Sequence, residues 1–271
     1  MEKTYREANC IIDAHCHIYP EKIAAKAVAG TDRFYDTTAA GLGTVTDLMA
    51  MGEQAGIGHF IVQSVATTAK QVKSINEFIS ASVAGNPKLT GLGTMHPDCE
   101  DPRAEIDHLM ELGLLGVKIH PDIQAFPIDD PRMMRTYELC EERGLPILMH
   151  TGDYRYDFSN PNRLIPVLKQ FKGLTVIGAH MGGWSLWDKA YEALHEYPNL
   201  FVDCSSTMPF SSPETAKRLI RAYGADRVLF GTDYPMWSPA NELTTFRSLG
   251  LTEEEEQAIL HDNAIRAFKL G

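Results

Sequence analysis

The fold is decided by the segment Cys10-Ile11-Ile12-Asp13-Ala14-His15-Cys16-His17, close to the start of the chain. Its first part, residues 10–14, is a short, mainly apolar run that predicts a buried β-strand. An open doubly wound sheet would place a glycine-rich phosphate loop directly after its first strand. Two histidines follow here without any glycine. The segment therefore disfavours the open sheet and leaves a closed barrel.

Seven further apolar runs, rich in β-branched residues, recur roughly 25 to 30 residues apart after a longer first gap. They predict strands at 59–65, 89–95, 116–119, 147–149, 174–179, 200–203 and 228–231. Helical patterns lie between the strands, at 69–85, 101–112, 131–143, 163–171, 186–196 and 213–223. Strands that alternate with helices form parallel sheets, and a (β/α)₈ TIM barrel needs about 250 residues. We expect an α/β TIM barrel as one domain over residues 1–271, with a short extra helix near 23–29.

Composition limits the possible partners and the cellular compartment. A hydrophobic share of 44% and a charged share of 23% are ordinary for a globular protein. The net charge of −11 disfavours nucleic acid and anionic membranes. No apolar run approaches the length of a membrane span or a signal-peptide core, and the five cysteines are scattered without a C-x-x-C pair. We expect a cytoplasmic protein that acts on a small molecule, with a monomer and a homo-oligomer both left open.

Histidines gather at one end of the predicted strands. Six of the ten lie at a carboxyl end, namely His15, His17, His96, His120, His150 and His180. Random placement would put about one there, and this rim is the active face of a TIM barrel. A carboxylate, Asp233, follows the last strand in the same way. Each residue alone could be structural, but together they indicate a shared metal site.

The ordered pattern resembles a known family. The pattern consists of His15-x-His17, His150, Ala-His180-Met-Gly-Gly and Phe-Gly-Thr-Asp233-Tyr-Pro. It resembles the amidohydrolase superfamily, in the amidohydrolase-related (amidohydrolase 2) branch of metal-dependent TIM barrels, which includes lactone hydrolases and decarboxylases. The resemblance extends from residue 11 to the tail at 259–264.

The resemblance implies a catalytic divalent metal, usually zinc. Carried over, His15, His17, His150 and Asp233 are the metal ligands, and His180 is a general acid or base beside them. Three imidazoles and a carboxylate suit Zn²⁺, with Mn²⁺, Fe²⁺ or Co²⁺ as alternatives. Asp233 then has a second, catalytic role, because it accepts the proton of a metal-bound water.

Three further residues are candidates for substrate binding. Lys118 and His120 share one face of the strand at 116–119 and its end. Lys118 could anchor a substrate carboxylate, be carboxylated and bridge two metals, or form a salt bridge inside the barrel. Arg155 could clamp a carboxylate with two hydrogen bonds, or lie in a solvated loop.

We therefore expect a metal-dependent hydrolase in which a metal-activated water attacks a lactone, cyclic amide or ester. One alternative is a metal-dependent, non-hydrolytic decarboxylase with the same ligands. Decarboxylating relatives tend to be longer than 271 residues, which favours hydrolysis. Another alternative is a catalytically inactive barrel that only binds a metal.

Overall fold

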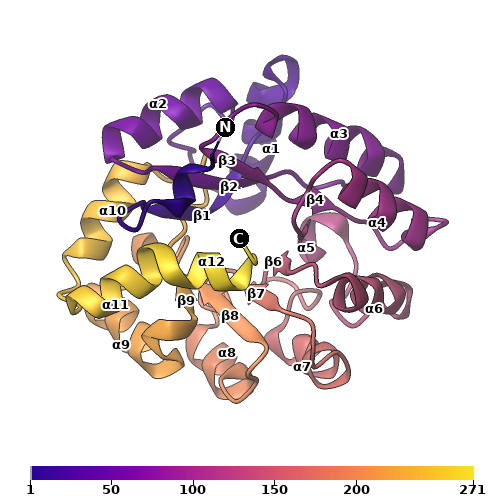
Figure 1. The fold of residues 1–271 in the computed structure, drawn as a ribbon. Helices are drawn as coiled ribbons and strands as arrows, with labels where there is room; N and C mark the ends of the chain where they lie inside the picture. The colour runs from indigo at the N-terminus through magenta and orange to yellow at the C-terminus, as the bar shows by residue number, and fades with distance from the viewer. Residues whose placement is uncertain (1) are drawn as a thin grey trace.

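A computed structural model describes residues 2–271. Its centre is a ring of parallel strands (Figure 1), which pair in chain order within two sets, the first three strands and the last six. The strands are β1 (Ile12–His17), β2 (His59–Gln63), β3 (Leu89–Gly91), β4 (Gly93–Thr94), β5 (Val117–Ile119), β6 (Ile147–Met149), β7 (Val176–Gly178), β8 (Leu200–Asp203) and β9 (Val228–Leu229). We call each strand position of the ring a stave. Strands β3 and β4 together form one stave, which is interrupted at Leu92; the Leu92 amide still donates to Val62 O at 2.9 Å. The ring thus has eight staves, as predicted.

The first and last staves close the ring. Ala14 N donates to Phe230 O at 2.9 Å, and Cys16 pairs with Tyr234 in a parallel bridge. The protein is therefore a TIM barrel, and the predicted fold class is confirmed. Because all strands run in the same direction, their carboxyl ends share one rim.

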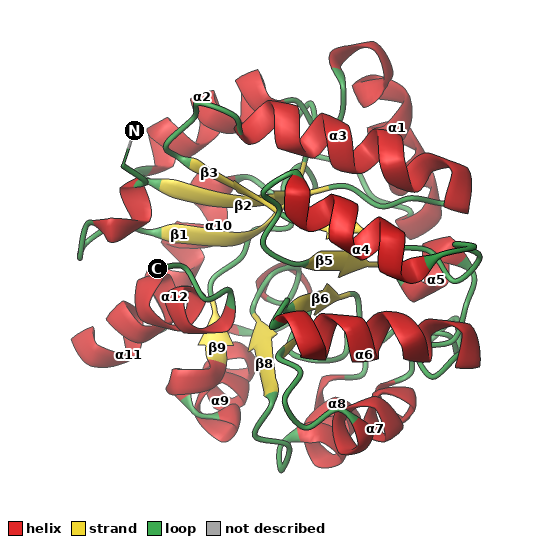
Figure 2. Cartoon of the chain, turned by 45° about the vertical axis from the view of Figure 1, so that its right-hand side comes forward, coloured by secondary structure: helices red, strands yellow, loops and turns green. Residues whose placement is uncertain are grey.

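Helices surround the ring, as Figure 2 shows in a view turned by 45° from Figure 1. They are α1 (Glu21–Tyr35), α2 (Val45–Ala55), α3 (Val72–Val83), α4 (Pro102–Glu111), α5 (Pro121–Gln124), α6 (Met134–Arg143), α7 (Pro161–Gln170), α8 (Trp187–Leu194), α9 (Pro213–Tyr223), α10 (Pro239–Arg247), α11 (Glu253–Gln257) and α12 (Asn263–Ala267). Local signals fix their ends. Helix α9 starts at Pro213 behind the cap Ser212, whose side chain accepts from Thr215 N, and Thr252 and Glu255 form the predicted capping box.

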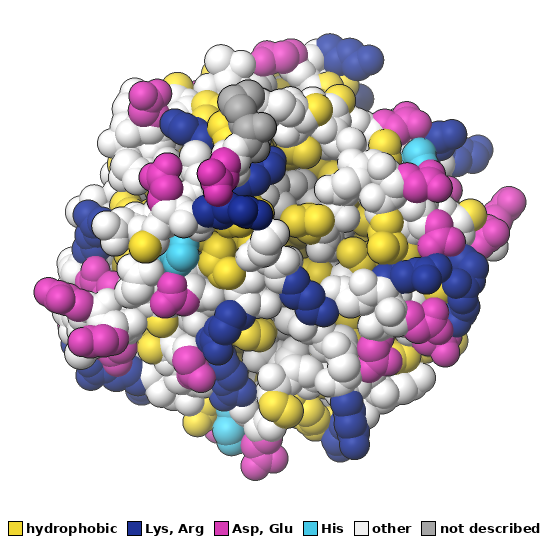
Figure 3. Space-filling model, in the orientation of Figure 1, with side chains coloured by type: hydrophobic (Ala, Val, Ile, Leu, Met, Phe, Trp, Pro, Cys, Tyr) yellow, Lys and Arg dark blue, Asp and Glu magenta, His cyan; other side chains and the backbone are white. Residues whose placement is uncertain are grey.

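Two apolar layers stabilise the barrel. One lies between the strands and the surrounding helices. The other fills the ring interior and includes Ile12, Ile61 and Leu148, together with Phe268 and Leu270 near the C-terminus. Helix α12 consequently crosses the end of the ring that lies opposite the carboxyl rim, in the foreground of Figure 1. On this face, charges of both signs are interspersed (Figure 3). No helix among residues 2–271 has the length and apolarity to cross a bilayer.

The sequence-based prediction was inaccurate for the first strand and for the helices that follow it. The first strand is Ile12–His17 rather than 10–14, since pairing with β2 continues to His17 and its partner Gln63. His15 and His17 therefore belong to the strand, and a register shift between Asp13 and Cys16 redirects the side chains there. Helix α1 has 15 residues instead of the seven expected at 23–29, and α2 was not predicted.

Candidate metal centre

The carboxyl ends of the strands open into a cavity of about 820 Å³. Helices α1 and α3 and the loops after the strands complete its walls. Most of the predicted site residues line it, namely His15, His17, Lys118, His120, His150, His180 and Asp233. Two do not: Arg155, and His96, whose Nδ1 instead accepts from Asp98 N at 3.2 Å.

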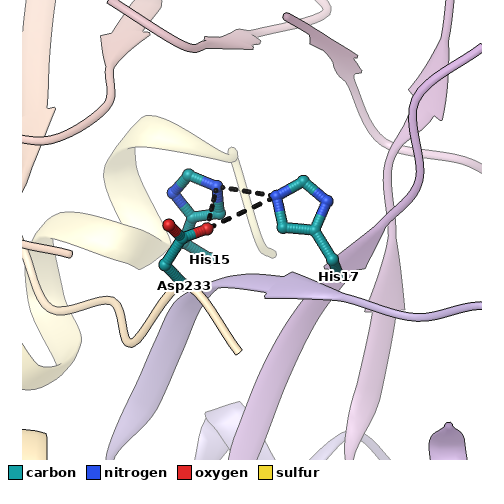
Figure 4. A group of neighbouring side chains, drawn as sticks. All are labelled: His15, His17 and Asp233. Atoms are coloured by element: carbon teal, nitrogen blue, oxygen red, sulfur yellow. Dashed lines mark hydrogen bonds and ion pairs between the residues drawn. The ribbon is translucent and has the colours of Figure 1, made fainter. Parts of the chain in front are cut away.

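Three donor atoms converge at the floor of the cavity (Figure 4). His15 Nε2 lies 3.2 Å from His17 Nε2, and these atoms lie 3.4 and 3.5 Å from Asp233 Oδ1. Donors bound to one ion at about 2.0–2.2 Å in tetrahedral geometry are about 3.3–3.6 Å apart. The spacing of the three atoms therefore fits a single divalent cation between them.

Asp203 fixes the orientation of His15. His15 Nδ1 donates to Asp203 Oδ2 at 2.9 Å, and both side chains are fully buried. Because the proton is on Nδ1, the lone pair of Nε2 faces the other two donors. Burial, followed by the Lys118 charge, lowers the pKa of His15 to about 4, so its ring is neutral at pH 7. Burial opposes ionisation of Asp203, but His15, His180 and the Ser205 hydroxyl together outweigh it and lower the Asp203 pKa to about 2.

The backbone around Asp233 is tied to the first strand. Asp13 accepts hydrogen bonds from Thr232 N at 3.0 Å and Thr232 Oγ1 at 2.6 Å, and also from His15 N at 3.1 Å. Asp233 itself has a left-handed backbone, with φ of 56°. Its second oxygen accepts from Ser206 Oγ at 2.7 Å. These contacts leave Asp233 Oδ1 directed at the two histidines.

Lys118 lies beside the donor group. Its Nζ lies 2.8 Å from His15 Nε2, and its side chain is fully buried where it borders the cavity. Burial lowers the Lys118 pKa to about 8. His120 Nε2 contacts Tyr35 Oη at 2.8 Å, while its Nδ1 accepts from Ile123 N. A bridging role for a carboxylated Lys118 and substrate contacts of both residues stay predictions.

His150 and His180 form a second pair next to the donor group. His180 Nε2 is 3.0 Å from His150 Nδ1, and the rings of His180 and His15 stack at 5.4 Å. His150 Nε2 faces Gly152 O at 3.0 Å, so both of its ring nitrogens have protein partners. The structure thus places His150 beside the three donors and not among them. Its assignment as the fourth ligand stays a prediction.

Arg155 is engaged away from the cavity. Its guanidinium binds Asp153 through Nε and Nη2, at 3.0 and 2.7 Å, and donates to Phe34 O at 2.6 Å. The guanidinium also lies 5.2 Å from the ring centre of Tyr35 and 5.8 Å from that of Trp184. Its two-point grip is on a carboxylate of the protein, so Arg155 anchors the end of α1 to the loop after β6.

Sequence reasoning missed three residues of the site. Asp203 could have been found from the sequence. It lies at the carboxyl end of the predicted strand at 200–203, just as Asp233 lies after the predicted strand at 228–231. Asp13 lies inside the segment that decides the fold, but its role depends on contact with Thr232 at the other end of the chain. Tyr35 reaches His120 only because α1 is longer than its sequence pattern indicates.

Comparison with known proteins identifies similar chains. A family model described as amidohydrolase matches residues 12–270. A 2-amino-3-carboxymuconate-6-semialdehyde decarboxylase of Dictyostelium discoideum is 25% identical, over 72% of this chain and 66% of that protein, just under two thirds of its length. The crystal structure of 5-carboxyvanillate decarboxylase from Sphingomonas paucimobilis has a TM-score of 0.75 and 20% identity, and covers 97% of this chain and 99% of its own. A dihydroxybenzoic acid decarboxylase of Polaromonas, with bound manganese and the inhibitor 2-nitroresorcinol, has a TM-score of 0.75, 19% identity and 97% coverage of both chains.

These comparisons contradict the expected hydrolysis. The relatives are described as decarboxylases, which matches the alternative interpretation and overturns hydrolysis as the main one. The physical reason for the error is that one donor set can serve both reactions, so the ligands do not discriminate between them. A divalent metal is supported, but zinc is not confirmed, since manganese is the ion in the Polaromonas structure.

Proposed function

The chain belongs to the amidohydrolase family, and from that premise we propose that it is a metal-dependent decarboxylase, which releases CO₂ from a small carboxylic acid without adding water. The observation that carries the proposal is the convergence of His15, His17 and Asp233 at the floor of the cavity, with the Lys118 amine beside them. The decarboxylase names of the relatives support the choice of reaction.

The proposed cofactor is one divalent ion per chain, held by His15, His17 and Asp233. Such an ion supplies positive charge that orients a carboxylate and polarises neighbouring oxygens. The nitrogen-rich donor set suits Zn²⁺, and Mn²⁺ is the alternative that metal analysis of the purified protein distinguishes. The cysteines of the protein are free thiols, and free thiols favour the cytoplasm as the proposed location.

The chain's own residues then bind the acid and handle one proton. Lys118 Nζ, the cation nearest the donors, attracts the substrate carboxylate. Loss of CO₂ leaves an electron pair on carbon that must accept a proton, so R–COO⁻ and H⁺ become R–H and CO₂. We assign this proton to His180 and Asp233. His180 Nδ1 donates to Ser205 O at 3.0 Å, and its Nε2, which lies 3.0 Å from His150 Nδ1, is the atom that would exchange the proton.

Metal loading and carbon dioxide release test the proposal. Protein loaded with Mn²⁺ or Zn²⁺ is incubated with the monocarboxylate 2,6-dihydroxybenzoate in H₂¹⁸O. We expect CO₂ release and an organic product without ¹⁸O. His15→Ala and Asp233→Asn should lose both the ion and the activity, whereas His108→Ala, on α4 outside the cavity, should keep both. A product that has gained ¹⁸O from water would refute decarboxylation. So would full activity in protein stripped of metal.

A further inference from the structure

The cavity has two chemically different parts. Next to the donor atoms, Trp184 and Trp237 both pack edge-on against Phe210, at 5.5 and 5.4 Å between ring centres. These flat walls suit a planar substrate ring. Farther out, the cavity continues between α1 and α3, which lie side by side in Figures 1 and 2. We call this part the apolar arm; it is lined by Ile23 and Ala27 of α1, by Val65, and by Ser74, Ile75 and Phe78 of α3.

The cavity is large for a small aromatic acid. Pockets of about 300–1,000 Å³ hold drug-sized ligands. At about 820 Å³, this cavity is near the upper end of that range. The arm is continuous with the donor group, so a single molecule can occupy both parts.

Positive charge is confined to one place in the interior. Lys118 is the buried cation of the lining, and it lies at the donor group. The other lysine of the lining, Lys22, is exposed on the first turn of α1. Arg155, the expected second carboxylate clamp, is held by Asp153 outside the lining. The described residues therefore offer a buried counter-charge to one carboxylate and none to a second carboxylate in the arm.

We infer that the substrate is a monocarboxylic acid whose planar head lies at the donor group and whose alkyl or alkenyl tail fills the apolar arm. This inference rests on the proposed function, since the carboxylate that is lost must lie at the donors. A carboxylate in the arm would lie against Ile75, Phe78 and Val65 with no buried cation beside it. The polar groups of this part of the lining, such as Gln71 and Ser74, are uncharged and exposed, so the transfer of the carboxylate from water is unfavourable. A hydrocarbon chain there gains affinity with each buried methylene.

Ligand binding to the metal-loaded protein tests the inference without requiring turnover. Three probes share one head: 2-nitroresorcinol, its 5-pentyl derivative and its 5-carboxy derivative. Each buried methylene tightens Kd by about three- to fourfold, so burial of three or more predicts at least about 30-fold tighter binding of the pentyl compound in calorimetry. The 5-carboxy compound should bind more weakly than the unsubstituted head. A pentyl compound that binds no tighter than the head overturns the inference.

Matched variants locate the tail. Ala27→Trp fills the arm from α1, and Ser74→Phe fills it from α3, so each should reduce the preference for the pentyl compound at least tenfold. Ala25→Trp makes the same substitution on the exposed side of α1, outside the lining, and should keep the preference. An unchanged preference in both arm variants overturns the inference.

The two failures are distinguishable. Release of CO₂ from 2,6-dihydroxybenzoate without any tail preference refutes the inference and keeps the proposed function. A tail preference in a protein that releases no CO₂ from any head or tailed acid refutes the proposed function, while the apolar arm stands as a binding site.

Discussion

Replacement of Asp203 by asparagine isolates the tautomer of His15 from the donor group itself. Asp203 Oδ2 accepts from His15 Nδ1 at 2.9 Å. Asp203 Oδ1 accepts from Ser205 Oγ, from Ser205 N at 3.0 Å and from His180 N at 3.1 Å. An asparagine that keeps its oxygen on the latter three donors must present its NH₂ group to His15. Two N–H groups then face each other, so the proton of His15 moves from Nδ1 to Nε2. A protonated Nε2 has no lone pair with which to bind a cation.

The size of the effect follows from the role of this contact. Loss of a carboxylate that orients a metal-binding histidine typically costs about 10–100-fold in metal affinity, or about 1.4–2.7 kcal/mol. The opposite amide orientation keeps an acceptor for His15 but faces NH₂ against three donors inside the barrel, which also costs stability. Because Asp203 is fully buried, water cannot relieve either mismatch.

Titration of the metal-free protein with Mn²⁺ or Zn²⁺ by calorimetry measures this effect. We expect Asp203→Asn to raise the metal Kd by about 10–100-fold. Asp188→Asn is the matched control, because Asp188 is 70% exposed and pairs with Arg218 on the surface. Thermal unfolding of both variants without metal separates weak metal binding from a failure to fold. An Asp203→Asn Kd within threefold of wild type, in folded protein, would refute the role of Asp203.

Three further predictions concern the surroundings of the site. Burial raises the pKa of Glu242 to about 8 from 4.5, so the folded protein keeps a proton that the unfolded chain releases, and stability falls as pH rises between those values. Glu242→Gln should remove this pH dependence of the free energy of unfolding, which amounts to at most about 5 kcal/mol between pH 4.5 and 8 and is measured by urea unfolding. Arg155→Lys should destabilise the fold by about 1–2 kcal/mol in the same assay with less than threefold change in the KM of a monocarboxylate, whereas a hundredfold higher KM would show that Arg155 binds substrate directly. Gly152→Ala should cost more stability than Gly56→Ala: both have positive φ, at 77° and 74°, but only the first new Cβ would meet backbone, 2.4 Å from Gly183 C. Equal losses in thermal unfolding would contradict this steric argument.

Much of the fold was predictable because its signals are local. Buried staves of a parallel barrel are continuous apolar runs, so β6 (Ile147–Met149) and β8 (Leu200–Asp203) have their predicted bounds. The end of β1 was misplaced because its second half carries His15 and His17, whose polarity resembles a loop. Those residues are buried only because the barrel supplies their partners, which a local pattern does not contain.

The site was predictable in residue type and only partly in contacts. Position at a strand end was enough to bring His15, His17 and Asp233 together, since every carboxyl end faces the same rim. The partners of Arg155 and His150 were not predictable. Both depend on loops whose paths are set by distant contacts, such as that of Arg155 with Phe34 O. The reaction was out of reach for a different reason, because the donors are common to hydrolysis and decarboxylation.

Closure of the ring has a consequence for the assembly of the protein in the cell. Two of the proposed donors, His15 and His17, precede the third, Asp233, by more than 200 residues. A nascent chain that has not yet emerged as far as Asp233 offers a cation only two imidazoles, so the proposed donor set is complete only after the last strand has been made. Once bound, the ion links stretches more than 200 residues apart, and its removal should loosen the seam between β1 and β9 first.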